Sequence, residues 1–273
     1  MGIDPATIKL VSLMPCTAKK AEARRPEMSN SIGLDTEPVF DTDFVLTTRE
    51  LGKLLRLNKL HPGAFKGQPA DHPLGEASGA GVVFGNSGGV MEASLRTAYE
   101  LVSKKSLPRL EFDEVRGLHK GLRMAKVELP MPQVDDSDQQ KNTMTLNVGV
   151  VHSAAQIRRL LDRLKNIRAS EPDPDDIVNN LHFLEVMACR GGCIGGGGQP
   201  KSEDPFIIPS RAARVYSEDE KSAVRKSHEN PSIKQAYVEF LGEPLGAKSR
   251  ELLHTRYRDR RYTPRDGPTE SKQ

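Results

Sequence analysis

The stretch from Leu184 to Pro200, which reads L-E-V-M-A-C-R-G-G-C-I-G-G-G-G-Q-P, constrains this chain more than any other. An apolar run ends at Cys189, three residues separate it from Cys193, and four consecutive glycines follow at 195–198. A glycine run costs conformational entropy and fills no space, so packing does not explain it. Two thiols on a glycine-rich backbone are typical of a soft metal centre, because glycine lets the chain pass close to a bulky cluster and turn its amide N–H groups toward it.

Other interpretations of these residues stay open at this point. Zinc knuckles usually use C-x-x-C with further Cys or His, and the seven histidines have no matching spacing. A cysteine protease would need a His partner that the sequence does not identify. The run G-N-S-G-G at 85–89 could cradle a phosphate at a helix start, but it lacks the lysine and spacing of a P-loop. Cys16, taken alone, could be a buried packing residue.

Length and charge limit the function classes. A chain of 273 residues can bury a real core, as one large domain or two lobes. The 40 basic and 37 acidic residues nearly balance, which argues against a nucleic-acid partner bound by bulk charge. The first residues lack a signal peptide pattern, and no stretch is long enough to span a bilayer. With three cysteines, an odd number, a disulfide framework is not favoured, so we expect a cytoplasmic protein without a membrane partner.

Short apolar runs alternate with stretches of helical periodicity. The patterns predict strands at 7–15 (buried), 44–47, 122–129, 144–151 and 181–187. They predict helices over 17–27, 90–102, 154–167 and 233–241, and a further one near 249–257. A helix is also expected to start from an N-cap at Thr48, and one or two helices are expected after Pro209, with Ser217 as a possible cap. Ser153 is the expected cap of the helix over 154–167. Residues 58–81 and 171–176 read as loops, and the polar segment 133–142 as a hairpin or insert.

This order predicts an α/β fold of two lobes with largely parallel sheets flanked by helices, followed by a helical carboxyl-terminal segment. Cys16 follows the first strand directly, and Cys189 follows the strand at 181–187. Open α/β sheets bind ligands at the carboxyl ends of their strands. We therefore expect Cys16, Cys189 and Cys193 to share one site between the lobes.

Two motifs carry a resemblance to a known family. M-P-C-T-A-K-K-A-E (14–22) resembles the second signature of the iron-only (FeFe) hydrogenases, and E-V-M-A-C-R-G-G-C-I-G-G-G-G-Q-P (185–200) resembles the third. F-V-L-T-T-R-E-L, G-A-G-V-V-F-G-N-S-G-G-V-M-E-A-S-L-R-T-A-Y-E and H-E-N-P-S-I-K-Q-A-Y-V-E-F-L-G-E-P-L are also similar to family sequence. The resemblance implies a large-subunit catalytic domain, partial, over 1–208, a small-subunit-like helical segment over 209–257, and a disordered tail over 258–273.

The resemblance also implies a cofactor and roles for particular residues. Cys16 and Cys189 would ligate a 4Fe-4S cubane, and Cys193 would be both a cubane ligand and the bridge to a two-iron centre that carries CO and cyanide. Lys19 would donate to a cyanide, as a charge-assisted bond. Met14, Phe84 and Met187 would pack near the two-iron site and limit water.

The chain departs from the family in one large respect. The first signature, T-S-C-C-P, which supplies the fourth cubane cysteine and a proton-relaying cysteine, is absent. Arg190 stands where proline is usual, and Asn86-Ser87 where Ala-Thr is usual. We therefore expect a carboxyl-terminal piece of a hydrogenase catalytic subunit, from a truncated gene, a misassigned start or a split enzyme.

The resemblance allows three functions. The first is reversible reduction of protons to H2, with ferredoxin or an NAD(P)H-linked electron-transfer subunit, hydrogenase maturation proteins and a separate amino-terminal half as partners. The second is iron–sulfur assembly of the Nar type, although Thr17-Ala18 and the run Gly195–Pro200 fit the hydrogenases better. The third is an inactive truncated fragment.

Overall fold

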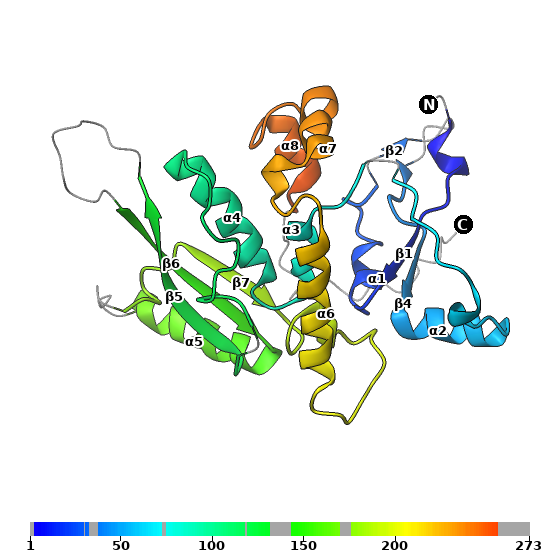
Figure 1. The fold of residues 1–273 in the computed structure, drawn as a ribbon, viewed down its shortest axis with the longest axis horizontal. Helices are drawn as coiled ribbons and strands as arrows, with labels where there is room; N and C mark the ends of the chain where they lie inside the picture. The colour runs from blue at the N-terminus through cyan, green and yellow to red at the C-terminus, as the bar shows by residue number, and fades with distance from the viewer. Residues whose placement is uncertain are drawn as a thin grey trace, which may run out of the picture. The chain divides into compact units, whose positions relative to one another are not determined.

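The computed structural model describes residues 3–29, 31–32, 38–72, 75–117, 119–131, 143–169 and 176–255. The chain divides into two units, residues 1–234 and 235–273. Figure 1 labels the helices and strands along the chain. The strands are β1 (Val11–Met14), β2 (Ser31–Ile32), β3 (Pro38–Val39), β4 (Phe44–Thr47), β5 (Leu122–Pro130), β6 (Thr143–His152) and β7 (Phe183–Met187). The helices are α1 (Lys19–Glu22), α2 (Thr48–Leu57), α3 (Gly79–Val82), α4 (Gly89–Ser103), α5 (Ala154–Ala169), α6 (Ile207–Lys221), α7 (Pro231–Ala236) and α8 (Ala247–Leu253). In the described part of the chain, no helix is both long and apolar enough to cross a bilayer.

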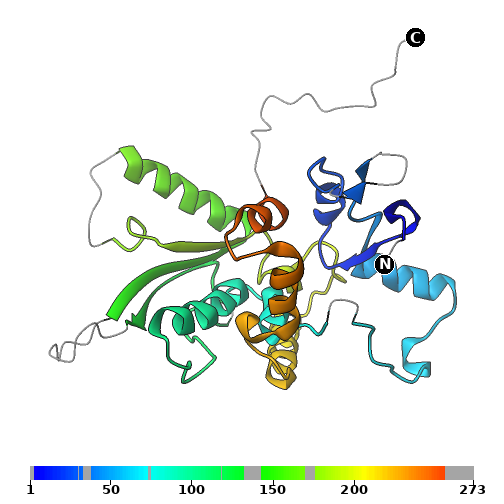
Figure 2. The ribbon, with the colours of Figure 1, turned by 90° about the horizontal axis from the view of Figure 1, so that it is seen from above.

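The larger sheet has the order β5-β6-β7, with β5 antiparallel to β6 and β6 parallel to β7. Helix α4 covers one face and α5 the other (Figures 1 and 2). Val148 and Val150 face the α4 side and Val151 faces the α5 side, and all three are at most 1% exposed. A continuous apolar run of this kind is what a strand covered on both faces requires. The α/β class that the sequence predicted is thus confirmed.

Helix α4 also carries a buried charge, Arg96, which is 0% exposed. Its five N–H donors are all used: two reach Asp219 at 2.9 and 2.8 Å, one reaches Glu92 at 2.6 Å, and two reach the carbonyls of Arg225 and Leu110. A buried guanidinium is tolerated only when its charge and donors are satisfied in this way. The network therefore joins α4 to α6, 123 residues further along the chain.

The smaller parallel sheet pairs β1 with β4, from Val11 opposite Phe44 to Met14 opposite Thr47. The prediction of a buried strand over 7–15 is wrong in two respects. The strand begins only at Val11, because Pro5–Thr7 forms a 3-10 turn capped by Asp4. In addition, Val11 and Leu13 are 51% and 53% exposed, since β4 is the neighbour of β1 in the described residues and no further element covers this face.

Helix α2 begins directly from β4. The predicted N-cap, Thr48, is displaced by one residue, because the cap is Thr47. The Thr47 hydroxyl accepts the amide of Glu50 at 3.2 Å, and the Glu50 carboxylate accepts the amide of Thr47 at 2.8 Å. This reciprocal capping box explains why the last strand residue and not the next threonine starts the helix.

The helices after residue 200 begin at different residues from those that the sequence predicted. A single helix, α6, begins before Pro209, and Ser217 lies inside it. Pro209 is tolerated because the first-turn amides of a helix have no intrahelical acceptor. The helix predicted over 233–241 starts two residues earlier, as α7 at Pro231, since the Asn230 side chain accepts the amides of Ser232 and Ile233.

The other predicted elements compare well with the structure. The strands at 44–47, 122–129, 144–151 and 181–187 and the helices at 90–102 and 154–167 are confirmed with small shifts at their ends. The helix at 17–27 is reduced to the single turn Lys19–Glu22. Residues 233–241 divide into the end of α7 and a π-helical turn over Tyr237–Leu241, and the predicted helix near 249–257 is α8. The segment 133–142 and the tail 258–273 lie outside the described residues.

Candidate functional site

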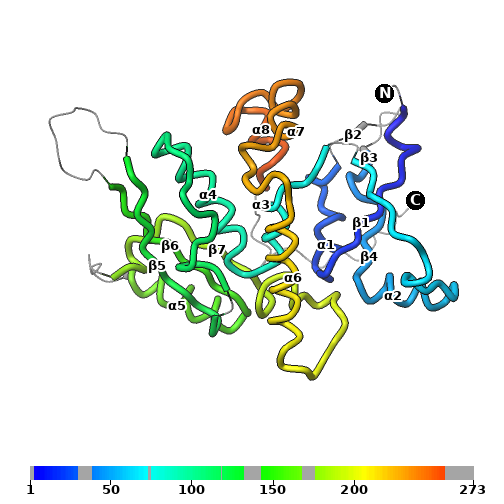
Figure 3. The backbone as a smooth tube through the Cα atoms, viewed as in Figure 1, coloured from blue at the N-terminus to red at the C-terminus, as the bar shows by residue number. Residues whose placement is uncertain are grey.

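The segment after β7 lies directly against the segment after β1. Figure 3 follows the chain from β7 through this segment into α6. The amide of Gly198 donates to the carbonyl of Pro15 at 2.8 Å. A Cβ at Gly196 would overlap that carbonyl, and one at Gly198 would lie 2.9 Å from the Pro15 carbonyl carbon. The glycine run is therefore explained by close backbone approach, which brings the Cys16 segment to the Cys189–Cys193 segment.

The three cysteine thiols are free and interact electrostatically. Desolvation raises the pKa of the Cys193 thiol most, and the neighbouring Cys16 and Cys189 raise it further, while Lys19 lowers it. Cys193 nevertheless keeps an exposed part, and Cys16 and Cys189 are half-buried. Thiols that oppose each other's ionisation in this way are a ready donor set for a cation or a cationic cluster.

These sulfurs do not gather as ligands of a single ion. Around one zinc the sulfurs lie about 2.3 Å from the metal, so they lie within about 4 Å of each other. Three thiols that converge so closely are absent from the part of the chain that the structure describes. Cysteine thiolates are the ligands of iron–sulfur clusters, so three neighbouring thiols are chemically suited to hold one.

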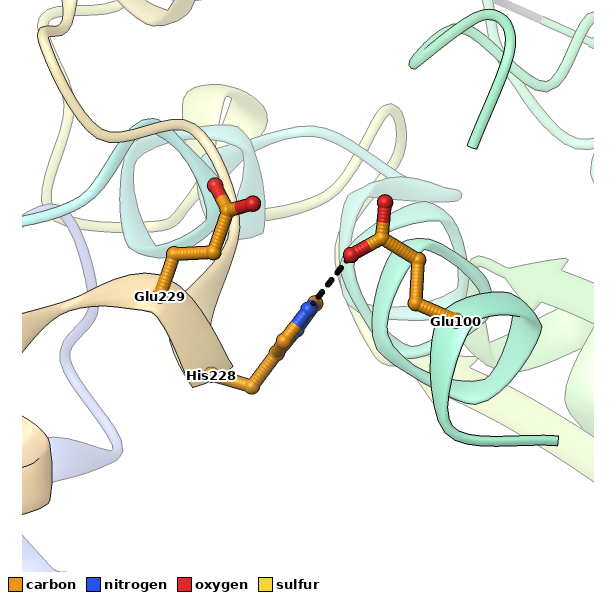
Figure 4. A group of neighbouring side chains, drawn as sticks. All are labelled: Glu100, His228 and Glu229. Atoms are coloured by element: carbon orange, nitrogen blue, oxygen red, sulfur yellow. Dashed lines mark hydrogen bonds and ion pairs between the residues drawn. The ribbon is translucent and has the colours of Figure 1, made fainter. Parts of the chain in front are cut away.

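One group of acidic and histidine side chains does converge within 4.8 Å, and it is made of Glu100, His228 and Glu229 (Figure 4). The ammonium of Lys226 already lies 2.7 Å from both carboxylates, and His228 pairs with Glu100 at 2.8 Å. These bonds and the Leu107 amide hold the pKa of Glu100 at about 2, against the raising effect of its desolvation. The lysine supplies the cation, so this group is a clamp between α4 and the segment before α7.

Of the other predicted site residues, Met14, Lys19 and Met187 are close to the cysteines in sequence, whereas Phe84 comes from a third segment. Met14 ends β1, and Met187 ends β7 with its sulfur against Gly192. Phe84 lies in the 3-10 turn after α3 and is 44% exposed. Lys19 opens α1 and forms an ion pair with Glu22, so its ammonium has a protein partner here.

Two arginines that the sequence analysis did not single out hold the glycine segment in place. Arg211, on α6, donates to the carbonyls of Ile194 at 2.9 Å and Pro200 at 3.0 Å. Arg49, on α2, donates to the carbonyl of Gly197 at 2.7 Å. Neither has a local sequence signal, because each contact joins distant parts of the chain.

Glu185 is a third residue that the sequence analysis passed over. It is a carboxylate within the apolar run of β7 and is 5% exposed. It accepts the amides of Gly88 at 2.6 Å and Met91 at 2.8 Å, at the start of α4. Desolvation raises the pKa of Glu185, while these amides lower it. The phosphate interpretation of G-N-S-G-G fails here, since the chain's own carboxylate takes these donors.

The histidines do not form a catalytic pair with a cysteine. His119 and His152 lie against each other with ring centroids 4.6 Å apart, and His182 accepts the amide of Asn147. The two rings, which are tilted by 46°, line a cavity of about 950 Å³ together with residues of the segment 190–211, and none of the cysteines lines it. The protease interpretation therefore has no support in the described residues.

Comparison with known proteins agrees with this arrangement. Residues 1–197 match the family described as "Iron only hydrogenase large subunit, C-terminal domain", and residues 206–260 match "Iron hydrogenase small subunit". The NADP-reducing hydrogenase subunit HndD of Solidesulfovibrio fructosivorans is 42% identical over 94% of this chain and 39% of its own length. Iron hydrogenase 1 of Clostridium pasteurianum is 37% identical over 94% of this chain and 41% of its own length.

Solved structures show the same likeness. The [FeFe]-hydrogenase HydA1 of Chlamydomonas reinhardtii matches with a TM-score of 0.72 and 38% identity, over 94% of this chain and 64% of that one. A more distant relative, the cytosolic Fe-S cluster assembly factor narfl of Xenopus tropicalis, is 29% identical over 94% of this chain and 48% of its own length. The chain spans less than half the length of these curated relatives. On the match over residues 1–197 and on these likenesses, the chain belongs to the iron-only hydrogenase family, as a large-subunit carboxyl-terminal domain followed by a small-subunit-like segment.

Proposed function

We propose that this chain is the catalytic part of a hydrogenase that reversibly reduces protons to H2. The observation that carries the proposal is the contact between Gly198 and Pro15, which brings Cys16 to the segment of Cys189 and Cys193. Family membership supports the same reaction, and the relatives at 42% and 37% identity are named as hydrogenases.

The cofactor would be a 4Fe-4S cluster joined to a two-iron centre with CO and cyanide ligands. Cys16, Cys189 and Cys193 would hold the cubane, and Cys193 would also bridge to the two-iron centre. When bound, this group supplies the redox chemistry that combines two protons and two electrons. The thiol donor set fits it, because cysteine thiolates are the ligands of such clusters, and the glycines let the Cys189–Cys193 segment lie against Pro15, next to Cys16.

The protein would contribute charge and the exclusion of water. Lys19 would exchange Glu22 for an anionic ligand and donate a charge-assisted hydrogen bond to it. Met14, Phe84 and Met187 would flank the same ligand with soft or apolar atoms. The 44% exposure of Phe84 leaves room for such a group to cover it.

A fourth thiolate would come from another polypeptide segment, because the sequence has three cysteines and a cubane takes four ligands. We propose a separate amino-terminal half as its source. The exposed apolar residues of the smaller sheet support this, since Val11, Leu13 and Phe44 are each more than half exposed. Parallel sheets in α/β proteins are normally covered on both faces.

The remaining partners follow from the same proposal. Electrons would come from ferredoxin or from an NAD(P)H-linked subunit, and a relative at 42% identity is named as an NADP-reducing hydrogenase subunit. Hydrogenase maturation proteins would deliver the two-iron centre. The cytoplasm is the compartment we propose, since free thiols are maintained there.

The test is anaerobic reconstitution of the chain together with an amino-terminal segment that carries the missing cysteine signature. Iron content, the electron paramagnetic resonance (EPR) signal of the reduced cluster, and H2 evolution after maturation would be measured. Cys193→Ala should abolish the two-iron centre and H2 evolution, and Cys16→Ala and Cys189→Ala should lower the cubane content. H2 turnover that persists in Cys193→Ala would refute the assignment.

Iron–sulfur assembly is the second candidate, because a relative named as a cytosolic Fe-S cluster assembly factor aligns over 94% of the chain. On this hypothesis the reconstituted protein transfers a cluster to a client protein and evolves no H2. An inactive fragment is the third, and it predicts a chain that aggregates and takes up no iron with or without the added segment.

A further inference from the structure

Glu185 is an anomaly in its strand. It stands between Leu184 and Val186 in β7, opposite Val150 of β6, and is 5% exposed. A buried carboxylate is costly unless donors satisfy it. Both of its oxygens have such a donor, one from Gly88 at 2.6 Å and one from Met91 at 2.8 Å.

The start of α4 needs this carboxylate. The first amides of a helix have no intrahelical acceptor, and a side chain at the N-cap normally satisfies one of them. The N-cap here is Gly88, with φ of +91° and no side chain. A Cβ at that position would collide with the carbonyl of Val115, so Ser, Thr or Asp cannot stand there. Glu185 supplies from another element the cap that position 88 cannot carry.

The same turn supports the cysteine segment. The amide of Ser87 donates to the carbonyl of Gly191 at 3.0 Å, between the two cysteines. A Cβ at Gly192 would lie 2.6 Å from the Ser87 nitrogen and 2.9 Å from the Met187 sulfur, which shows how closely the two segments approach. Glu185 thus lies four residues before Cys189 and accepts a hydrogen bond from Gly88, the residue that follows Ser87.

We propose that Glu185 is a positioning residue that fixes the Cys189–Cys193 segment on the Asn86–Gly89 turn and places a negative charge behind the cluster site. The functional part of this inference rests on the proposed function, because only a bound cluster would respond to that charge. The positioning part concerns the metal-free chain and is independent of it.

The first measurement is amide hydrogen exchange in the metal-free full chain. In Glu185→Ala, exchange at Gly88 and Met91 must rise. We also expect exchange to rise about tenfold at the amides of Ser87 and Gly192. The Gly192 amide donates to the backbone carbonyl of Cys189. Glu185→Gln keeps the length and one acceptor, so it should lie between the wild type and Glu185→Ala.

Asn230→Ala is the matched control. Asn230 is 4% exposed and accepts the amides of Ser232 and Ile233, so its loss also uncaps a helix. Its remaining bond goes to the carbonyl of Glu76. This variant should leave exchange at Ser87 and Gly192 unchanged. Equal exchange at these two amides in Glu185→Ala, Asn230→Ala and the wild type would overturn the proposal.

The second measurement is the midpoint potential of the reconstituted cluster. Glu185→Gln removes a negative charge, so the reduced cluster becomes easier to form and the potential should rise, whereas Asn230→Ala should not change it. An unchanged potential in Glu185→Gln would refute the electrostatic role. If the wild type takes up no cluster, the proposed function fails, but the exchange result still decides the positioning role.

Discussion

The β5–β7 sheet and the β1–β4 sheet differ in how completely the chain covers them. Leu129 of β5 and Val150 of β6 are fully buried between the sheet and α4. Val11 and Leu13 of β1, by contrast, are more than half exposed, and so is Phe44 of β4. The first sheet has its covering helices within the described chain, whereas the second keeps an apolar face that another polypeptide can cover. The cysteines lie where these two regions meet.

The largest loss of folding stability is expected from a substitution in the covered region, the β5–β7 sheet with its helices. Arg96→Met removes the cation that contacts the buried Glu92 and Asp219 at 2.6 and 2.8 Å, and leaves them the longer contacts with Arg116 and the pair between Asp219 and Arg225. Breaking a buried pair from one side costs about 3–5 kcal/mol, and because these other cations remain we expect a loss of about 3 kcal/mol. The free energy of unfolding in urea measures this loss. Arg158→Ala is the control, because its pair with Asp162 is exposed and should contribute less than about 1 kcal/mol. Equal losses in the two variants would contradict the buried network.

Truncating one leucine in each sheet compares how much burial contributes to the stability of the two sheets. Leu129 is 0% exposed and Leu13 is 53% exposed. Leu129→Ala should therefore cost about 2–5 kcal/mol and Leu13→Ala less than about 1 kcal/mol. When the amino-terminal segment is added, the cost of Leu13→Ala should rise and that of Leu129→Ala should not. A Leu13→Ala cost that does not respond to the segment would mean that the segment does not cover β1.

A fall in pH should lower the folding stability through one group in each region, over two different pH ranges, and the losses should be smaller than those of the substitutions above. Desolvation, together with the charges of His152 and Arg123, lowers the pKa of His119 from 6.5 to about 4. The unfolded chain binds this proton more readily, so the stability contributed by neutral His119 is lost as the pH falls from 6.5 to about 4. In α2, the amide of Thr47 lowers the pKa of Glu50 from 4.5 to about 2, so its contribution is lost between pH 4.5 and about 2.

The measurement is a stability–pH curve from urea unfolding. His119→Gln should flatten the curve in the upper window, and Glu50→Gln should flatten it in the lower one. If both variants change the same window, the assignment of the two groups to separate regions is wrong.

The sequence predicted the local features of the fold and site well. The strand before Cys189, the helix over 90–102 and the meeting of two cysteine segments follow from apolar period and from where α/β folds place their sites. It did not reveal that Glu185 caps α4 or that Arg96 binds Asp219, because such partners are set by tertiary packing between distant residues. The exposure of β1 was missed for a related reason, since an apolar run shows that a strand needs cover but not which polypeptide supplies it.

The Arg96 network also has a consequence for synthesis of the chain. Asp219 is translated 123 residues after Arg96, which takes about 6–25 s at ribosomal speeds. Until α6 leaves the ribosome, Arg96 lacks its two hydrogen bonds to Asp219, and closing α4 over it would bury two unsatisfied donors of a charged group. The covered sheet therefore completes its packing late in translation, and its apolar residues remain accessible to chaperones during that interval.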